Sequence, residues 1–383
     1  MKVKLKDFVV PTMLENKIVR RPDLGDHKTE DLVFIRSIGE LKKLSKIKPI
    51  KPTDYALMNN STPSFGQVDN RWGCVAWSRT VSYSSFDQCN LRPLAVDGYV
   101  DCVCNDGYDL AYEGITRFAL WPALHLGLES VISARNIDKN AFKMWICTRG
   151  DEVWRTIEFG EYPKTYVGKE LNIKLNELLK EGKLTPTNKT YTGWADLDTG
   201  RIVHNQEYEF EGNKYVRVKI KLNISDSLAQ YYFSDETIKR ENTKYLWVKV
   251  EPIKWVIDNW DMLPTQLNPQ GSGEAEYIDI QTQEAITSGI PFSPSFDYNV
   301  SNWRTSRVRK YLNGIEEFSK NNFLSEALDM ELELNQQKTR LISQMIKKEF
   351  ETAKARVEED ARRIKTPRPY RGPFTATLND GDD

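Results

Sequence analysis

Three histidines are the first residues to consider as catalytic or metal-binding groups in this chain. His27 lies in a polar loop, His125 in the apolar stretch LWPALHLGL, and His204 in GRIVHNQEY. None has a second ligand at a metal-binding spacing, and none stands near a recognisable nucleophile motif. The histidines therefore predict no catalytic site, although a Ser-His-Asp or Cys-His site built from distant residues stays open.

Two cysteines, Cys102 and Cys104, stand two residues apart in YVDCVCNDGYD, where we expect a strand with both side chains on one face. A zinc site needs two more soft ligands, and none is evident at a matching spacing. Same-face neighbours on one strand also have poor geometry for a disulfide. We predict neither metal nor disulfide here, and no cofactor. Five cysteines, an odd number, favour synthesis in a reducing cytoplasm.

Acidic residues gather in the same turn-rich region, at Asp97, Asp101, Asp106 and Asp109. Paired carboxylates serve glycoside hydrolases, and clustered carboxylates bind calcium. The spacing matches no EF-hand loop, and acidic turns are commonly just solvated. We therefore predict no enzyme activity and no catalytic or metal-binding residue, with a hydrolase as the third hypothesis for function.

Two loops combine aromatic side chains with hydroxyls, carboxylates and amides, the groups that stack on sugars and hydrogen-bond to them. They are WSRTVSYSSFDQCN (77–90) and PFSPSFDYNVSNWR (291–304). Loops on a stable core carry function, so either could bind a ligand. The alternative is that both are ordinary loops in which Trp77 and Trp303 anchor the fold. The candidate ligand-binding residues are Tyr83, Phe86, Asp87, Phe296, Asp297 and Tyr298.

The overall composition excludes several classes of partner. The formal net charge is -1, from 54 basic and 55 acidic residues, which gives no electrostatic reason to expect nucleic acid. No run approaches the length of an apolar membrane span, so we expect no membrane insertion. The N-terminal stretch MKVKLKDFVVPTMLENK lacks the apolar region of a secretory signal, which argues against Sec export.

The stretch YLWVKVEPIKWVIDNW (245–260) alternates apolar and polar side chains on either side of Pro252. This pattern predicts two short strands broken at the proline. We expect Trp247, Trp255 and Trp121 to lie in a core and not in an aromatic binding surface. GKELNIKLNELLKEGKLT predicts a helix from near Lys169, and Asn313-Gly314 predicts the end of a short helix.

Residues from about 323 to 364 contain no proline or glycine, and we expect one continuous helix roughly 60 Å long. Its narrow apolar stripe suits contact with a neighbouring chain better than a globular core. The tail, 365–383, has three prolines and an acidic end, and we expect it to run extended over a second neighbour. The candidate partner-binding residues are Leu334, Leu341, Met345, Ile346, Phe350, Pro369, Tyr370 and Phe374.

Several sequence blocks along the chain form a recognisable set. FGEYPKT starts at Phe159, VEPIKW at Val250 and NWRTSRVRKYLNG at Asn302, with Phe318 after it. DLVFIRSIGELKKL, VAWSRT, VDGYVD and ITRFALWPALHL complete the set. Together these blocks resemble a poorly characterised family of bacterial and phage domains with a C-type-lectin-like core. The resemblance covers most of residues 31–318. It implies an α+β fold with a mixed or antiparallel sheet, in which the EPIxW block is a scaffold strand.

The order of the blocks differs from that of the family. The family's second half occupies 31–126 and its first half 157–318, which predicts a circular permutation joined through 127–156. Because the termini of compact domains often lie close together, such a join costs little. Two incomplete copies would instead leave unpaired strand edges and too little core. The expected organisation is an N-terminal arm (1–30), the lectin-like domain (31–318), a long helix (319–364) and the tail.

The resemblance and the helix together favour a non-enzymatic structural component of a bacteriophage virion, in its capsid or tail. It would be synthesised in the host cytoplasm and held to other virion proteins and copies of itself by the helix and tail. The alternative is an adhesin or receptor-binding module for a cell-surface glycan or a protein. Sulfatase-modifying oxidases share the lectin-like fold and use a cysteine pair for copper chemistry, but Cys102 and Cys104 do not match that arrangement, so no enzyme activity is implied.

Overall fold

The computed structural model describes most of the chain. The described residues are 2–16, 18–19, 27–41, 43–44, 51–59, 63–68, 71–83, 91–97, 118–149, 152–195, 201–220, 230–232, 237–239, 245–292, 302–334 and 336–364. Within these ranges, the structure describes only the backbone at 18–19, 63–75, 81–83, 91–97, 146–149, 152–154, 195, 230–232, 237–239, 336–337 and 364.

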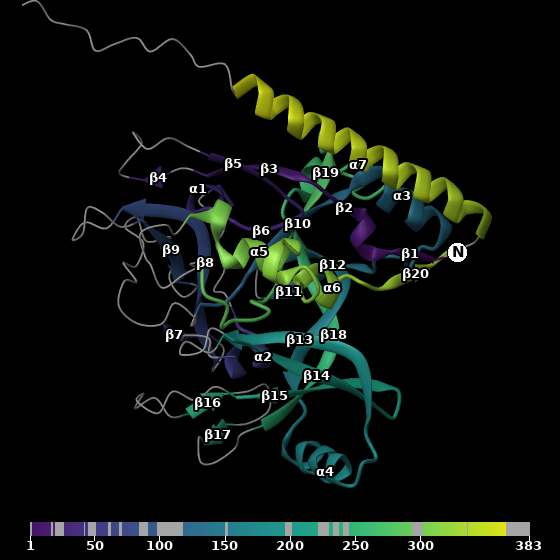
Figure 1. Cartoon of the computed structure of the whole chain (residues 1–383). Coiled ribbons are helices and arrows are strands. Elements are labelled where there is room, and N and C mark those ends of the chain that lie inside the picture. The colour runs from purple at the N-terminus through teal and green to yellow at the C-terminus, as the bar shows by residue number, and fades with distance from the viewer. Residues whose placement is uncertain are drawn as a thin grey trace, which may run out of the picture.

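A ten-stranded antiparallel sheet lies at the centre of the molecule (Figure 1). Its main path runs β13-β14-β15-β18-β19-β10-β2, while β12 pairs with β18 and β11, and β6 pairs with β10. Since β10 pairs with β19, the segments 31–126 and 157–318 contribute to one sheet. The strands are β13 (Thr185–Ala195), β14 (Ile202–Phe210), β15 (Asn213–Lys219), β18 (Tyr245–Ile257), β19 (Tyr277–Thr282), β10 (Pro122–Gly127), β2 (Val9–Val10), β12 (Glu152–Tyr166), β11 (Met144–Arg149) and β6 (Val33–Ile35).

Smaller sheets and short helices surround this sheet. The remaining strands are β1 (Lys2–Lys4) with β20 (Glu331–Glu333), β3 (Thr12–Asn16) with β5 (His27–Asp31), β16 (Gln230–Tyr232) with β17 (Thr237–Lys239), and β4 (Ile18–Val19), β7 (Pro63–Val68) and β9 (Leu91–Asp97) around β8 (Arg71–Tyr83). The helices are α1 (Ile38–Leu41), α2 (Asp54–Met58), α3 (Leu128–Ile137), α4 (Lys169–Lys180), α5 (Arg307–Asn313), α6 (Phe323–Ala327) and α7 (Gln336–Ile364), with 3-10 turns at Leu5–Phe8, Trp260–Met262, Trp303–Thr305 and Glu316–Phe318. The fold is therefore a mixed α+β architecture with antiparallel sheets and a C-terminal helix.

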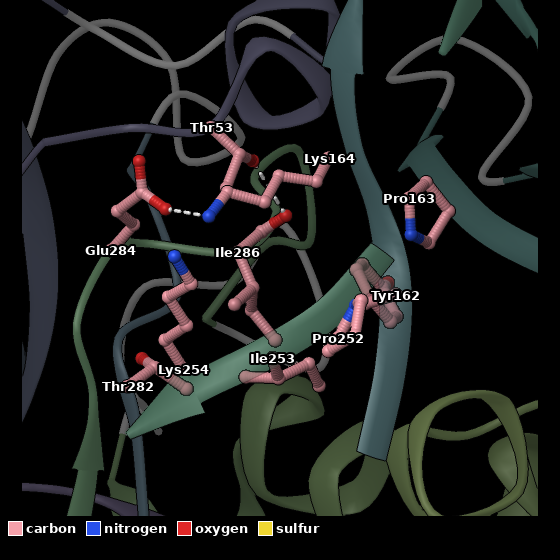
Figure 2. A pocket seen from close by; sticks show the side chains of 10 residues that line it. All are labelled: Thr53, Tyr162, Pro163, Lys164, Pro252, Ile253, Lys254, Thr282, Glu284 and Ile286. Carbon is pink, nitrogen blue, oxygen red and sulfur yellow. Dashed lines mark hydrogen bonds and ion pairs between the residues drawn. The ribbon is translucent and has the colours of Figure 1, made fainter. Parts of the chain in front are cut away.

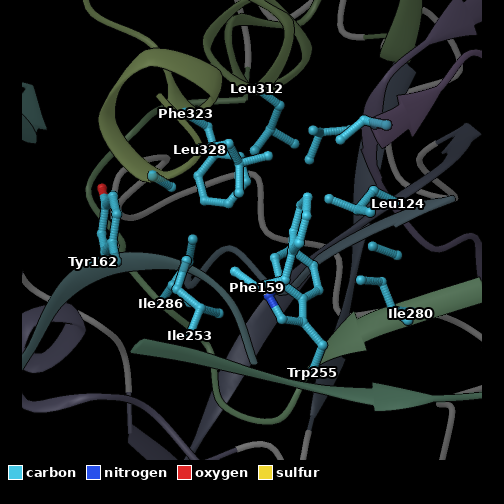
Figure 3. Packing of buried hydrophobic residues seen from close by; sticks show 14 of the residues in the cluster. Leu124, Phe159, Tyr162, Ile253, Trp255, Ile280, Ile286, Leu312, Phe323 and Leu328 are labelled. Carbon is cyan, nitrogen blue, oxygen red and sulfur yellow. Dashed lines mark hydrogen bonds between the residues drawn. The ribbon is translucent and has the colours of Figure 1, made fainter. Parts of the chain in front are cut away.

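The tryptophans of the central strand lie in the core. Trp255 is fully buried and its indole N–H donates to the Phe159 carbonyl (2.7 Å) in the cluster shown in Figure 3. Trp247 is fully buried in a second cluster, where it packs with Leu175 of α4. The prediction is confirmed for both residues. Trp121 is only partly buried, with its indole N–H on the Thr282 carbonyl (2.5 Å).

The expected break at Pro252 is wrong, because β18 is one strand of 13 residues that pairs with β12 along its length. The irregularity lies in the partner strand, whose register shifts between Glu158 and Glu161. Gly160 sits in that shift at φ +83°, a conformation that glycine adopts without strain. A bulge in β12 thus accommodates the proline opposite Glu161, and the central strand continues.

The N-terminal segment is not a separate arm. Val3, Phe8, Val9 and Leu14 are buried in the main core, and β2 pairs with β10 of the central sheet. Strands of two to five residues are too short for an alternating pattern to stand out in a sequence that also carries charges. Residues 2–16 therefore belong to the body of the domain.

The continuous helix expected from 323 to 364 is also wrong. The chain forms α6, then the short strand β20 against β1, and only then α7. The amides of Leu5 and Lys6 donate to the carbonyls of Met330 (2.9 Å) and Leu328 (3.2 Å), so the N-terminal segment holds this stretch extended. Tertiary pairing overrides the helical propensity of LDMELEL.

Helix α7 lies along one end of the domain beside α3 and β2, while α4 lies at the opposite end (Figure 1). Its residues Ile342, Ile346 and Val357 are buried against the chain's own body. The expectation that the apolar stripe faces only a neighbouring chain is therefore wrong. No helix within the described ranges, α7 included, has the length and apolarity to cross a membrane.

Candidate functional site

A groove of about 640 Å³ separates α7 from the edge of the central sheet. Val10 of β2, Thr12 and Met13 of β3, and Pro11 between these strands line one side, together with His125 of β10 and Tyr277 of β19. The facing wall is α7. Its lining residues are Met345, Lys348, Glu349, Thr352, Ala353, Arg356, Val357 and Asp360. The groove therefore brings together the N-terminal segment, the sheet and the C-terminal helix.

An aromatic stack stands in this groove. The rings of His125 and Tyr277 lie 3.7 Å apart between centroids and only 14° from parallel. They come from neighbouring antiparallel strands, where diagonal side chains on one face are within reach of each other. Tyr277 remains 37% exposed. Burial, with Asp279 and Glu276 nearby, raises the pKa of the Tyr277 hydroxyl, so it stays protonated. The groove thus contains a fixed and accessible aromatic ring.

A chain of polar groups continues from the stack into the protein. The Thr12 hydroxyl and His125 Nδ1 lie 2.8 Å apart, and His125 Nε2 lies 3.4 Å from Asp279 Oδ1. Arg36 then joins Asp279 (2.9 Å) to Asp258 (2.5 Å). This network joins β3, β10 and β19 to Arg36, which follows β6, and to Asp258, which follows β18.

The two carboxylates share one buried guanidinium, and their pKa values move apart. Burial raises the pKa of Asp258 to about 6, although Arg36 acts against this. Burial acts in the same direction on Asp279, but hydrogen bonding from His125 and the charge of Arg36 lower the pKa of Asp279 to about 2. Two like charges this close cannot both ionise as freely as one, so the second proton is held more tightly.

Hydroxyl, imidazole and carboxylate in this order are the parts of a nucleophile, its base and an orienting group. In this network Asp279 already pairs with Arg36, and its 3.4 Å separation from His125 is at the long limit of hydrogen-bond distances. The arrangement suits a structural network better than proton transfer. No local sequence signal points to it, because Thr12, His125 and Asp279 stand in three different parts of the chain.

A carboxylate of α7 caps the first turn of helix α3. Helix α3 follows Gly127, which has no side chain to accept its first amides. Glu349 of α7 accepts them instead, from the amides of Glu129 (2.7 Å) and Ser130 (3.1 Å). A Cβ at Gly127 would lie 2.4 Å from Glu349 Oε2, so this approach requires glycine. Burial raises the pKa of Glu349, although the two amide donors oppose the shift.

A second cavity, shown in Figure 2, lies between β12, β18 and the segment 282–286. The Lys164–Glu284 ion pair stands on its edge, and the Thr53 hydroxyl donates to the Ile286 carbonyl (3.1 Å). Its volume of about 20 Å³ is of the size that holds a single water. We therefore do not consider it a ligand site.

The ligand-binding residues expected from sequence lie outside the part of the chain whose side chains are described. Tyr83 ends β8, but its side chain is not described. The other five residues lie outside the described residues altogether: Phe86, Asp87, Phe296, Asp297 and Tyr298. The same holds for Cys102, Cys104, Asp101, Asp106 and Asp109, and for the side chain of Asp97. Among the described residues, no group of three or more His, Cys, Asp or Glu side chains could hold a metal ion.

The partner-binding residues expected on the C-terminal helix and tail divide into three groups. Leu334 and Ile346 are buried in the chain's own core, which corrects their expected role at an interface. Met345 and Phe350 are half-buried, and Leu341 is 60% exposed. The tail residues Pro369, Tyr370 and Phe374 lie outside the described residues. Amphipathic spacing identifies the stripe, but it does not say whether the covering surface belongs to the same chain.

Comparisons of the chain with protein-family models, with curated proteins and with solved structures found no match. The features that bear on function are therefore the groove, the outer face of α7 and the resemblance of the sequence blocks.

Proposed function

We propose that this chain is a non-enzymatic structural component of a bacteriophage particle, built on a circularly permuted lectin-like domain. Helix α7 and the tail join it to neighbouring subunits, either copies of itself or other virion proteins. Two features support this: the way the sequence blocks meet in space, and the outer face of α7.

The permutation is supported by contacts between the block at 302–318 and the block that starts at residue 31. These blocks are consecutive in the family's order but far apart in this sequence. Asn313 Oδ1 accepts the amides of Leu32 (2.8 Å) and Val33 (3.0 Å). Asp31 accepts the Trp303 indole N–H (2.9 Å) and pairs with Arg309 (2.5 Å). A permuted chain should keep this contact, because the two blocks join in the unpermuted form.

The outer face of α7 is the observation that carries the structural role. The helix is 29 residues long, or roughly 43 Å, and its inner face is already packed on the domain. Leu341, the most exposed large apolar side chain among the described residues, lies on its other side with Lys338 within one turn. Lys347 and Lys354 are also exposed, farther along the helix and about 120–140° around it from Leu341. An exposed leucine with a lysine one turn away suits a partner with an acidic, partly apolar surface.

Sedimentation velocity over a concentration series tests this role. We expect the full chain to self-associate, and Leu341→Glu to weaken association by about tenfold or more, equivalent to about 1.4 kcal/mol. Ile173→Glu is the matched control, because Ile173 is an exposed apolar residue on α4 at the opposite end of the domain. If Leu341→Glu associates as the unsubstituted chain does, α7 is not the contact surface.

The alternative function, an adhesin that binds a glycan, is favoured by a different observation. The groove presents the open ring of Tyr277 between acidic and basic side chains, and this requires no contact through the outer face of α7. Both roles are compatible with one virion protein.

A further inference from the structure

We propose that the groove between α7 and the part of the central sheet formed by β2, β10 and β19 binds a neutral oligosaccharide, with one pyranose ring stacked on Tyr277. The site is made of other residues than the loops at 77–90 and 291–304, and it does not include Leu341, whose substitution tests assembly.

The ring of Tyr277 provides a rigid aromatic platform in the groove. Tyr277 is held in place because His125 covers one side of its ring at 3.7 Å. His125 is in turn fixed by Thr12 and Asp279, so the platform does not need to order when a ligand arrives. Tyr277 as a residue is 37% exposed, and it lines the groove. A rigid, accessible aromatic face is what the apolar face of a pyranose ring packs against.

Polar side chains along the groove can hydrogen-bond to sugar hydroxyl groups. Among the described residues, the side chains of Glu129, Lys348 and Asp360 line the groove without an ion-pair partner. The Thr352 hydroxyl donates to the Lys348 carbonyl (2.7 Å), which leaves its oxygen free to accept. Carboxylates, an amine and a hydroxyl together offer acceptors and donors for sugar hydroxyl groups. These groups are spread along the groove and do not converge on one point.

The charges that line the groove disfavour a strongly charged ligand. The ion pair of Glu276 with Arg356 (2.7 Å) neutralises one acid and one base, and Glu349 is engaged by the α3 amides. The remaining Glu129, Asp360 and Lys348 carry both signs of charge, so a strongly charged ligand meets a like charge at some point. A single aromatic ring is also not the cage that quaternary ammonium groups require. A neutral ligand fits best.

The length and volume of the groove suit a chain of several sugar rings. The α7 wall runs from Met345 to Asp360, which is roughly 22 Å at the helical rise per residue. The volume of about 640 Å³ lies within the range of ligand-binding clefts. The side chains of Val10, Met13 and Val357 form apolar walls that can cover the sugar-ring faces not stacked on Tyr277. A groove of this form accommodates several rings in a row, which favours an oligosaccharide over a single sugar.

Isothermal titration of the full chain with chitohexaose, cellohexaose, maltohexaose and mannohexaose tests the site. We expect at least one of these probes to bind. Tyr277→Ala should weaken that binding by at least about tenfold, and Tyr277→Phe should stay within about threefold because the ring remains. Thr352→Trp fills the groove from the exposed side of α7 and should also abolish binding, without disturbing β19. Ile173→Ala, on α4, is the control and should bind normally.

The site is refuted if none of the four probes binds, or if Tyr277→Ala and Thr352→Trp both bind as the unsubstituted chain does. It is equally refuted if hexalysine binds in the groove and the neutral probes do not, because the ligand is then cationic. Thermal unfolding of each variant shows whether a loss of binding is a loss of folding. Since Leu341→Glu leaves the groove residues unchanged, failure of the sugar site is distinguishable from failure of assembly.

Discussion

Glu326 of α6 is a carboxyl group with only 2% of its surface exposed, and it should make the stability of this protein depend on pH. Its Oε1 accepts the Thr192 amide (2.9 Å) and hydroxyl (2.6 Å), and its Oε2 accepts the Tyr311 hydroxyl (2.8 Å). No cation contacts it among the described residues. Burial raises the pKa of Glu326 from 4.5 to about 7, although these donors oppose the shift.

The sign and size of the effect follow from this shift. The folded state binds the Glu326 proton more tightly than the unfolded state does, so the contribution is complete below pH 4.5 and is lost as the pH rises through about 7. The difference corresponds to about 3 kcal/mol of unfolding free energy. Asp258, whose pKa is raised to about 6, acts in the same direction, so the comparison needs a variant at Glu326 alone.

Glu326→Gln is that variant. Its amide oxygen can accept from Thr192, and its NH2 can donate to the Tyr311 hydroxyl oxygen, because that hydroxyl can turn towards Tyr162 (2.8 Å). We expect the variant to lose the part of the decline in stability between pH 5 and pH 8 that Glu326 contributes, to keep the part that Asp258 contributes, and to exceed the unsubstituted chain at pH 8 by about 2 kcal/mol. Tyr162→Phe, which leaves the carboxyl group in place, should keep the decline.

Urea unfolding across this pH range measures the effect. Because a chain of 383 residues need not unfold in one step, hydrogen exchange of the Thr192 amide, which donates to Glu326, supplies a local measurement. If Glu326→Gln and the unsubstituted chain show the same dependence on pH, Glu326 does not titrate in this range and the reasoning is refuted.

Three further substitutions test the packing around the groove and the core. Gly160→Ala should lower the unfolding free energy by about 2 kcal/mol or more in urea titrations, because Gly160 has φ +83° and a Cβ there would lie 2.6 Å from the Ala327 carbonyl oxygen; an unchanged midpoint would contradict the bulge. Glu349→Ala should cost about 1–3 kcal/mol and speed hydrogen exchange of the Glu129 and Ser130 amides, because these two α3 amides lose their acceptor. Gly127→Ala should reproduce this effect by displacing the carboxylate, and the double variant should be no worse than either single one; additive losses would show that the two residues act separately.

Local patterns predicted the elements that depend on neighbouring residues. Alternation around Trp247 and Trp255 indicated buried strand positions, and both are buried. The expected helix near Lys169 is α4, and Gly314 closes α5 in the left-handed conformation that Asn313-Gly314 predicts. These features are encoded within a few residues, so the sequence reveals them.

The features that shape the groove come from contacts between distant segments. The β1–β20 pairing replaces part of an expected helix, and Glu349 caps a helix more than two hundred residues earlier in the chain. The contact of Thr12 and Asp279 with His125 has no local signature either. Periodicity gives the face of α7 that is apolar, but only the fold shows that this face covers the chain's own α3 and sheet edge.

The central claim is that the outer face of α7 joins this chain to its neighbours. Chemical cross-linking of a mixture of isotopically light and heavy chains, read by mass spectrometry, tests it most directly, since mixed-isotope products arise only between chains. We predict mixed-isotope cross-links from Lys338, Lys347 and Lys354, which are exposed on α7, and their loss in Leu341→Glu. Cross-links from these lysines that join residues of one chain only, at concentrations where the protein associates, would contradict the claim.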